Sequence, residues 1–261
     1  MEHSKGELRR LKLLELIKAH GKISIQDITG ATGCSEATAR RDLDALEKSG
    51  QIIRTIGGAI YEGALKQSSE LPFADKRFFE REGKEQIAAA AADLVQEGDV
   101  IGLTGGTTTF FIARALKLHR NITVVTNAVN IAYELAEAEG VQVVMIGGVM
   151  RAKSYELSGP LAESVIEKIN VTKMFLGVDG VSVQHGFTMH SELEARIAQL
   201  MIERANEVYA VFDHSKLEKS ALFTIIPLQQ ATGIITNKPP EDWFRQACRE
   251  RQVAIHTGEG S

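Results

Sequence analysis

The sequence holds only two cysteines in 261 residues, Cys34 and Cys248, and they form no Cys-x-x-Cys pair. Such sparse and widely separated thiols argue against both a disulfide framework and a zinc site, and we expect both to be buried. No apolar run approaches the roughly 20 residues that cross a bilayer, and residues 1–5 lack the apolar core of a signal peptide. The sequence therefore predicts a cytoplasmic protein with no membrane segment.

The chain also lacks the usual signatures of catalysis. It contains no His-Glu-x-x-His segment, no nucleophile elbow with Ser, Asp and His in order, and no cysteine cluster. It has no low-complexity tract either, and its 44% hydrophobic and 25% charged residues are typical of a folded globular protein. We therefore expect no metal and no cofactor. The length leaves room for one large domain, or for a small and a medium one.

Charge is divided unevenly along the chain. Residues 1–61 contain ten Lys and Arg against eight Asp and Glu, a net charge of +2, whereas residues 62–261 contain twenty against twenty-six, a net charge of −6. A basic segment ahead of an acidic body is typical of a nucleic-acid-binding module joined to another domain. Random scatter of charge is the alternative, because the difference is small.

Residues 1–61 begin with two predicted helices. Apolar residues at helical spacing over 8–17 indicate the first, and residues 23–31 indicate a short second helix. Gly33 marks the turn that follows it. A third helix after this turn completes the order of elements in a helix-turn-helix, whose last helix enters the major groove of DNA.

The third helix begins after Ser35, a favourable N-cap. Three of its apolar residues fall at helical spacing and must face inward: Ala39, Leu43 and Leu46. Residues 51–60 then indicate a hairpin of the kind that lies along the DNA backbone as a wing. The residues that we expect to contact DNA are Ser35, Glu36, Thr38, Arg40 and Arg41 on the helix and Arg54 on the wing. A helical interaction module with solvated arginines is the alternative.

The body follows a linker, which we place at residues 62–82 because they show little periodicity and contain Gly, Ser, Pro and several charges. The predicted domains are therefore a winged helix-turn-helix at 1–61 and a larger domain at 83–261. In the larger domain, continuous apolar strands alternate with helices. Strands of this kind are buried on both faces, which predicts an α/β fold with a mostly parallel sheet and helices on both faces.

Ligands of such sheets bind beyond the carboxyl ends of the strands. A glycine turn there, followed by hydroxyls at a helix N-terminus, suits a phosphate. Cations and carboxylates at the other strand ends suit the remainder of a phosphosugar. The candidate ligand-binding residues are Thr104, Gly105, Gly106, Thr107, Thr108, Asn127, Arg151, Asp179, Glu194 and Lys216. Each also has an ordinary structural interpretation, as a turn former, a helix-end carboxylate or a solvated charge.

Several of these segments resemble a known family. Residues 33–47, together with Gly50 and residues 54–59, closely resemble the N-terminal domain of DeoR-type bacterial transcriptional regulators. In the body, the matching segments are Gly106 to Thr108, Thr126-Asn127, Gly147-Gly148 with Arg151, Gly177 to Gly180, and Asp213 to Lys216. The resemblance implies an effector-binding domain with the ribose-5-phosphate isomerase fold, used as a sensor.

We therefore expect a repressor of a sugar-catabolism operon that binds double-stranded operator DNA as a homodimer or homotetramer. A phosphorylated sugar is expected to relieve the repression. A phosphosugar isomerase with a regulatory DNA-binding head is the alternative, since Asp179 or Glu194 with Lys216 could supply a base and an electrophile. A body that serves only oligomerisation is a third possibility. We favour a regulator over an enzyme, because an isomerase does not require the DNA-binding head.

Overall fold

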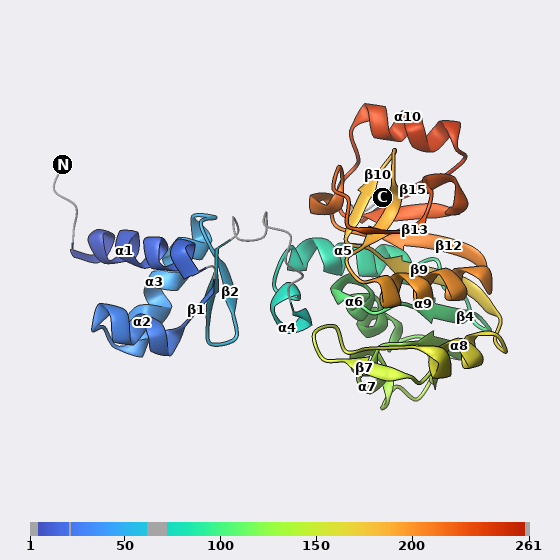
Figure 1. Ribbon diagram of the computed structural model, residues 1–261, viewed down its shortest axis with the longest axis horizontal. Helices are drawn as coiled ribbons and strands as arrows, with labels where there is room; N and C mark the ends of the chain where they lie inside the picture. Colours follow the sequence, from blue (N-terminus) through green and yellow to red (C-terminus); the bar gives the residue numbers. More distant parts are fainter. Residues whose placement is uncertain (1–4, 21, 62–71, 259–261) are drawn as a thin grey trace. The chain divides into compact units, whose positions relative to one another are not determined.

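The computed structural model describes residues 5–20, 22–61 and 72–258 (Figure 1). The chain divides between Phe79 and Glu80 into two units, and each unit has its own hydrophobic core. No described helix is long and apolar enough to cross a membrane.

The first unit, up to residue 61, is built from three helices and a small sheet. The helices are α1 (Lys5–His20), α2 (Ile25–Thr32) and α3 (Glu36–Lys48), and the strands are β1 (Lys22–Ser24), β2 (Ile53–Thr55) and β3 (Gly58–Ile60). The predicted helices and the β2–β3 hairpin are confirmed. The strand β1 pairs antiparallel with β3 and was not predicted, since three residues are too few to show an alternating pattern. Because β1 includes residues 23 and 24, α2 begins at Ile25, two residues later than predicted.

The core of the first unit confirms the inward face of α3. Ala39 and Leu43 are fully buried and Leu46 is 5% exposed. The apolar stripe of the first helix is broader than its buried face, because Leu8 and Leu11 are 54% and 50% exposed. Only the C-terminal part of that stripe packs on the other helices.

Caps define both ends of α2 and the start of α3. Ser24 Oγ accepts a hydrogen bond from Asp27 N at 3.1 Å, and Ser24 N donates to Asp27 Oδ2 at 3.2 Å. These contacts form a capping box, and the hydrogen bonds from Ser24 lower the pKa of the Asp27 carboxyl. Gly33 ends α2 at φ +65°, in the left-handed region that glycine adopts most readily. Ser35 then caps α3 by accepting from Thr38 N at 3.3 Å.

Residues 62–71 of the predicted linker lie outside the described residues. The described part of the linker is more helical than expected, since it contains α4 (Phe73–Lys76) and the first residues of α5 (Arg81–Ala92). A helix of four residues is too short to show an apolar period, although Phe73 is only 6% exposed. The domain boundaries themselves stay a prediction.

The second unit is centred on a seven-stranded sheet. Its strands are β4 (Val100–Leu103), β5 (Ile122–Thr126), β6 (Val141–Met145), β9 (Val171–Gly177), β12 (Ala205–Val211), β14 (Gly233–Thr236) and β15 (Ala254–Thr257). They lie in the order β15-β14-β12-β9-β4-β5-β6, and every neighbouring pair is parallel. The predicted parallel sheet is confirmed.

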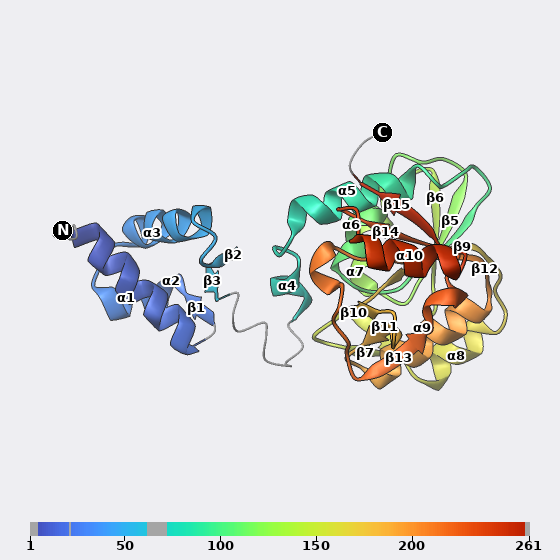
Figure 2. The same cartoon turned by 90° about the horizontal axis from the view of Figure 1, so that it is seen from above.

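Helices cover both faces of this sheet (Figure 2). One core cluster contains residues from α5, α6 (Thr107–Leu116) and α7 (Val129–Leu135), and the other contains residues from α8 (Pro160–Ile166), α9 (Glu192–Glu203) and α10 (Asp242–Glu250). In β9, Phe175 belongs to the first cluster, whereas its neighbours Met174 and Leu176 belong to the second. This alternation explains why the strands are continuous apolar runs, because both of their faces are buried.

Two small antiparallel sheets complete the unit and were not predicted. One pairs β7 (Val149–Arg151) with β8 (Glu156–Ser158), and the other has the order β10-β11-β13. The strands of the second are β10 (Gly180–Ser182), β11 (Gly186–Met189) and β13 (Phe223–Ile226). The apolar run at residues 222–226 predicts a further strand of the main sheet, and this expectation is wrong, because β13 pairs with β11 in the small sheet. An apolar run identifies a strand but not the sheet to which it belongs.

Two predictions of burial are also wrong. The apolar spacing of residues 193–201 predicts that Leu193 faces inward. It is 57% exposed, because the inward position in the first turn of α9 belongs to Glu194, which is 6% exposed. Cys34 is only half-buried, and its sulfur lies 3.1 Å from Thr32 Oγ1 in the turn before α3. Cys248 is buried as predicted, and burial raises the pKa of its thiol to about 11.

Candidate functional site

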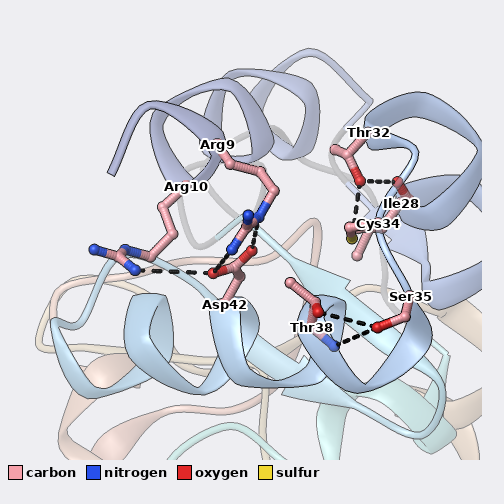
Figure 3. Close-up of polar contacts among 8 residues, drawn as sticks. All are labelled: Arg9, Arg10, Ile28, Thr32, Cys34, Ser35, Thr38 and Asp42. Atoms are coloured by element: carbon pink, nitrogen blue, oxygen red, sulfur yellow. Dashed lines mark hydrogen bonds and ion pairs between the residues drawn. The ribbon is translucent and has the colours of Figure 1, made fainter. Parts of the chain in front are cut away.

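The third helix of the first unit is held against the first helix by a charge pair (Figure 3). Arg9 on α1 donates to both carboxylate oxygens of Asp42 on α3, at 2.5 Å from Nε to Oδ2 and 3.1 Å from Nη2 to Oδ1. Arg10 Nη1 lies 3.8 Å from Oδ1 of the same carboxylate. Asp42 is 4% exposed, and its hydrogen bond raises the pKa of the Arg9 guanidinium. A two-pronged contact of this kind fixes the orientation of α3.

The polar residues predicted to contact DNA lie at accessible positions in the N-terminal half of α3. Ser35, Glu36, Arg40 and Arg41 are exposed, and Thr38 is half-buried. The hydroxyls of Ser35 and Thr38 lie 3.0 Å apart (Figure 3), and Arg40 Nη2 lies 3.5 Å from Glu36 Oε2. Arg41 thus extends from the exposed side of α3, next to the residue Asp42 that fixes this helix to α1. DNA contact by these residues stays a prediction.

Arg54, the candidate residue of the wing, packs against the same helix. Its Nε lies 3.6 Å from Asp44 Oδ1 on α3, and its side chain is 21% exposed. Arg54 therefore ties β2 to α3, and its buried Nη1 is a donor without a hydrogen-bond partner among the described residues.

In the second unit, the order of the strands reverses between β4 and β9. From β4 the sheet continues to β5 and β6, whereas from β9 it continues to β12, β14 and β15. At such a reversal the connections leave toward opposite faces, and the crevice between them is where ligands of open parallel sheets bind. The predicted loop at 104–109 leaves β4, and Asp179 follows β9. Both therefore flank the reversal point.

The loop after β4 is tied to its neighbours on both sides. The hydroxyl of Thr104, which is 1% exposed, accepts the N–H of Gly177 at 2.9 Å from the end of β9. The N–H of Gly105 donates to Asn127 Oδ1 at 3.0 Å, beyond the end of β5. Three predicted residues, Thr104, Gly105 and Asn127, therefore come together. The hydroxyl of Thr104 and the N–H of Gly105 are therefore already engaged in hydrogen bonds within the protein.

The helix α6 begins directly at this loop. Gly106 is its N-cap at φ +126°, a conformation open to glycine, and Thr107 and Thr108 form the first turn with 7% and 8% exposure. The first N–H groups of a helix have no partner within the helix and attract anions. The structure thus places a helix N-terminus at the point that the glycine turn predicted.

Glu156 is a residue of this site that the sequence did not reveal. Its Oε2 accepts a hydrogen bond from Asn127 Nδ2 at 2.9 Å, and the residue is 5% exposed. A Cβ placed on Gly105 would lie 2.1 Å from Glu156 Cγ and 2.4 Å from its Oε1, so the carboxyl packs directly on this glycine. Glu156 lies on β8, which was not predicted, and no motif singles it out in the sequence.

The pair Arg151 and Glu194 joins segments that are far apart in the chain. Arg151 Nη1 donates to Glu194 Oε1 at 3.0 Å, and Ser154 Oγ donates to the same oxygen at 2.6 Å. Glu194 lies in the first turn of α9, where its N–H donates to Ser191 Oγ at 3.4 Å. Ser154 was also missed, because it lies in the turn of the β7–β8 hairpin. The hairpin and α9 are therefore connected at the site.

Asp179 and Lys216 lie at the ends of neighbouring strands. Asp179 Oδ2 accepts the N–H of His190 at 3.1 Å, just before α9. Lys216 ends the short helix η2 (His214–Lys216), which follows β12. A β-bridge between Val181 and Leu217 places this turn beside the segment that follows Asp179.

The arrangement combines groups for two kinds of recognition. The N-terminus of α6 suits an anion, whereas the carboxylates of Glu156, Asp179 and Glu194 can accept hydroxyl hydrogens. No group of three or more His, Cys, Asp or Glu side chains in the described segments could hold a metal ion. These features fit a small ligand that carries both phosphate and hydroxyl groups.

Comparison with known families agrees with this division of the chain. Residues 9–63 match the family described as the DeoR-like helix-turn-helix domain, and residues 80–238 match the DeoR C terminal sensor domain.

Similar proteins include two regulators from Escherichia coli. A putative aga operon transcriptional repressor is 36% identical over 88% of this chain and 86% of its own length. The glycerol-3-phosphate regulon repressor is 29% identical over 93% of this chain and 95% of its own length. Among solved structures, ribose 5-phosphate isomerase A from Methanocaldococcus jannaschii aligns with 53% of this chain and 55% of its own, at 19% identity and a TM-score of 0.41.

Proposed function

This chain belongs to the DeoR family of transcriptional regulators, and we propose that it represses a sugar-catabolism operon until a phosphorylated sugar binds its second unit. The observation that carries the proposal is the co-occurrence of two sites in one chain. Arg40 and Arg41 are exposed on a helix of the first unit, and the second unit gathers polar groups at the reversal point of its sheet. A repressor that responds to a metabolite needs one site for DNA and a separate site for the effector.

The proposed contacts to DNA follow from the chemistry of the first unit. Arg40 and Arg41 can pair with guanine or phosphate, and Ser35, Glu36 and Thr38 lie at the end of α3 that enters the groove in helix-turn-helix proteins. Arg54, whose side chain on β2 is 21% exposed, would contact a backbone phosphate beside the groove through its exposed part. We further propose a homodimer or homotetramer, because paired half-sites require paired recognition helices.

The proposed contacts to the effector follow from the second unit. The N–H groups of Gly106, Thr107 and Thr108, with the two threonine hydroxyls, would hold the phosphate at the positive end of α6. Asn127 supports this loop through Gly105. Asp179 and Glu194 would bind sugar hydroxyls, and Arg151 and Lys216 would supply positive charge. The name of the glycerol-3-phosphate regulon repressor is consistent with a phosphate-bearing effector.

We propose that the second unit senses the sugar and does not transform it. The two relatives described above, which match 88% and 93% of this chain, are named repressors and not enzymes. An isomerase with a regulatory head would also need the DNA-binding unit to serve a second purpose. No observation favours that alternative.

The decisive experiment is a fluorescence anisotropy titration of the full chain on the promoter of the neighbouring operon. The titration is repeated with a panel of pentose, hexose and triose phosphates, and with the matching unphosphorylated sugars as controls. We expect specific binding that one phosphorylated sugar weakens by at least tenfold. Absence of specific binding to such a promoter would overturn the repressor function, and product formation from the sugar phosphates would support an enzyme.

A further inference from the structure

Glu156 places a buried negative charge at the loop where we propose that the phosphate binds. The residue is 5% exposed, and its carboxyl contacts the Cα of Gly105, one residue before the N-cap of α6. Asn127 connects the two groups, since its Oδ1 accepts from Gly105 N at 3.0 Å and its Nδ2 donates to Glu156 Oε2 at 2.9 Å. An anion of the protein itself therefore lies beside the end of the helix that attracts anions.

The Glu156 carboxylate and a bound phosphate would repel each other at the N-terminus of α6. A carboxylate at a helix N-terminus is stabilised by the helix dipole and by the unpaired N–H groups. A phosphate that enters the same position meets a like charge in a buried environment, where charges are weakly screened. Either the phosphate binds weakly or the carboxylate moves away.

We infer that Glu156 is an internal anion at the N-terminus of α6, and that a phosphate group must displace its carboxylate in order to bind. This inference rests on the proposed function, because it takes the loop at 105–108 as the phosphate site. It adds a residue that determines the affinity for the effector and explains how binding is transmitted.

The displacement of Glu156 reaches the rest of the site through the hairpin. Glu156 lies directly opposite Arg151 in the register of β7 and β8, so both side chains stand on one face of the hairpin. Arg151 donates to Glu194 on α9 at 3.0 Å, and Ser154 in the hairpin turn donates to the same carboxylate. Movement of the Glu156 carboxylate therefore changes the charge that faces Arg151, and through it the contact with α9.

The backbone of the hairpin is also tied to the strand end beside the loop. Leu157 N donates to Asn127 O at 2.7 Å, and Val129 N donates to Tyr155 O at 3.0 Å. These two bonds flank Glu156, so the release of its side chain from Asn127 loosens the hairpin backbone locally without detaching it. The expected response is a rotation of one side chain with a change in the Arg151 contacts, and not an opening of the whole sheet.

The test uses the full chain with inorganic phosphate, which has no sugar hydroxyls. Glu156→Gln removes the charge, keeps the length of the side chain, and leaves a carbonyl that can accept from Asn127. At constant ionic strength we expect this variant to bind phosphate at least fivefold more tightly than the wild type, measured by calorimetry or by the thermal shift. Glu163→Gln is the matched control, because it removes the same charge from α8, where Glu163 faces Arg196 at 3.7 Å. We expect it to stay within twofold of the wild type.

A second measurement on the wild type covers the case in which the variant does not fold. Hydrogen exchange is followed over residues 149–158 with and without saturating phosphate. We expect faster exchange in the hairpin with phosphate, because its tether to the loop is released. A purely structural Glu156 predicts slower or unchanged exchange.

The outcomes separate this inference from the proposed function. If Glu156→Gln binds phosphate no more tightly than the wild type while a sugar phosphate still releases the operator, the displacement is wrong and the repressor function stands. If neither protein binds phosphate and no sugar phosphate alters operator binding, the phosphate site and the displacement both fail. Weaker binding by the Gln variant would also overturn the displacement, because it would make Glu156 a supporting residue.

Discussion

Replacement of Gly105 by alanine tests the packing at the centre of the candidate effector site. Gly105 is not among the positive-φ glycines, so its backbone accepts an alanine without torsional strain. The added Cβ would lie 2.1, 2.2 and 2.4 Å from Cγ, Cδ and Oε1 of Glu156, far inside van der Waals contact. Glu156 must therefore move, and its hydrogen bond with Asn127 is lost. Over-packing costs about 1–3 kcal/mol and an unpaired buried polar group costs about 1–3 kcal/mol, so we expect a loss of roughly 2–6 kcal/mol in the free energy of unfolding.

The single tryptophan of the chain reports on the correct unit. Trp243 lies at the start of α10 in the second unit and is 43% exposed, so its fluorescence follows the unfolding of that unit alone. A loss of roughly 2–6 kcal/mol lowers the midpoint of thermal unfolding of this unit by roughly 4–24 °C. Gly30→Ala is the contrasting control, because nothing lies within 4 Å of its Cβ position in α2 and alanine favours helix. Because Gly30 lies in the first unit, this variant should leave the unfolding midpoint that Trp243 reports unchanged.

A double variant identifies the cause of the loss. If the clash with Glu156 is responsible, Gly105→Ala should cost less than about 1 kcal/mol in a Glu156→Ala background, because the crowding atoms are gone. An equal loss in both backgrounds would show that the contact with Glu156 is not what requires a glycine. A midpoint that is unchanged in the single variant would refute the packing of the carboxyl on Gly105.

Three further predictions address the two units separately. Arg41→Ala should weaken operator binding about tenfold in an anisotropy titration with unchanged thermal stability, whereas Arg249→Ala on α10 should leave it unaltered. Thr108→Val should keep operator affinity but raise the sugar phosphate concentration needed for release about tenfold, because a hydroxyl donor to the phosphate is lost. Burial and the hydrogen bond to Glu207 raise the pKa of Tyr209 to about 12. The protonated phenol is thus favoured in the folded state, so stability should fall between about pH 10 and pH 12, and Tyr209→Phe should remove this part of the pH dependence.

The fold of the first unit could be predicted from the sequence because its signals are local. Ser24, Gly33 and Ser35 act within one helical turn of their own positions, and the inward spacing of Leu43 and Leu46 needs no knowledge of distant segments. The contact of Arg9 with Asp42 spans 33 residues, and no periodic pattern announces it. The half-buried state of Arg54 has the same origin, since its partner Asp44 lies on another element.

In the second unit, the strands of the main sheet were predictable and the small sheets were not. The apolar runs of β4, β5, β6, β9, β12 and β14 can be recognised in each strand by itself. The edge strand β15 has no such run and was not predicted. The strands of the β7–β8 hairpin have three residues each and the hairpin presents no such run. Residues at strand ends, such as Asn127 and Asp179, could be found because the parallel topology brings all carboxyl ends to one edge.

Two different structural features therefore bring residues into the candidate site: the strand order of the main sheet and the β7–β8 hairpin. The loop after β4 and the end of β9 meet because of the strand order, so any sequence that forms this sheet brings Thr104 and Gly177 together. Arg151 and Glu156 enter the site only through a hairpin that the sheet does not require. We propose that the helix N-terminus supplied by the sheet binds a phosphate, which many ligands share, and that the charges of the hairpin distinguish one ligand from another. Selectivity for the effector should consequently change more readily by substitutions in residues 149–158 than by substitutions in the glycine loop.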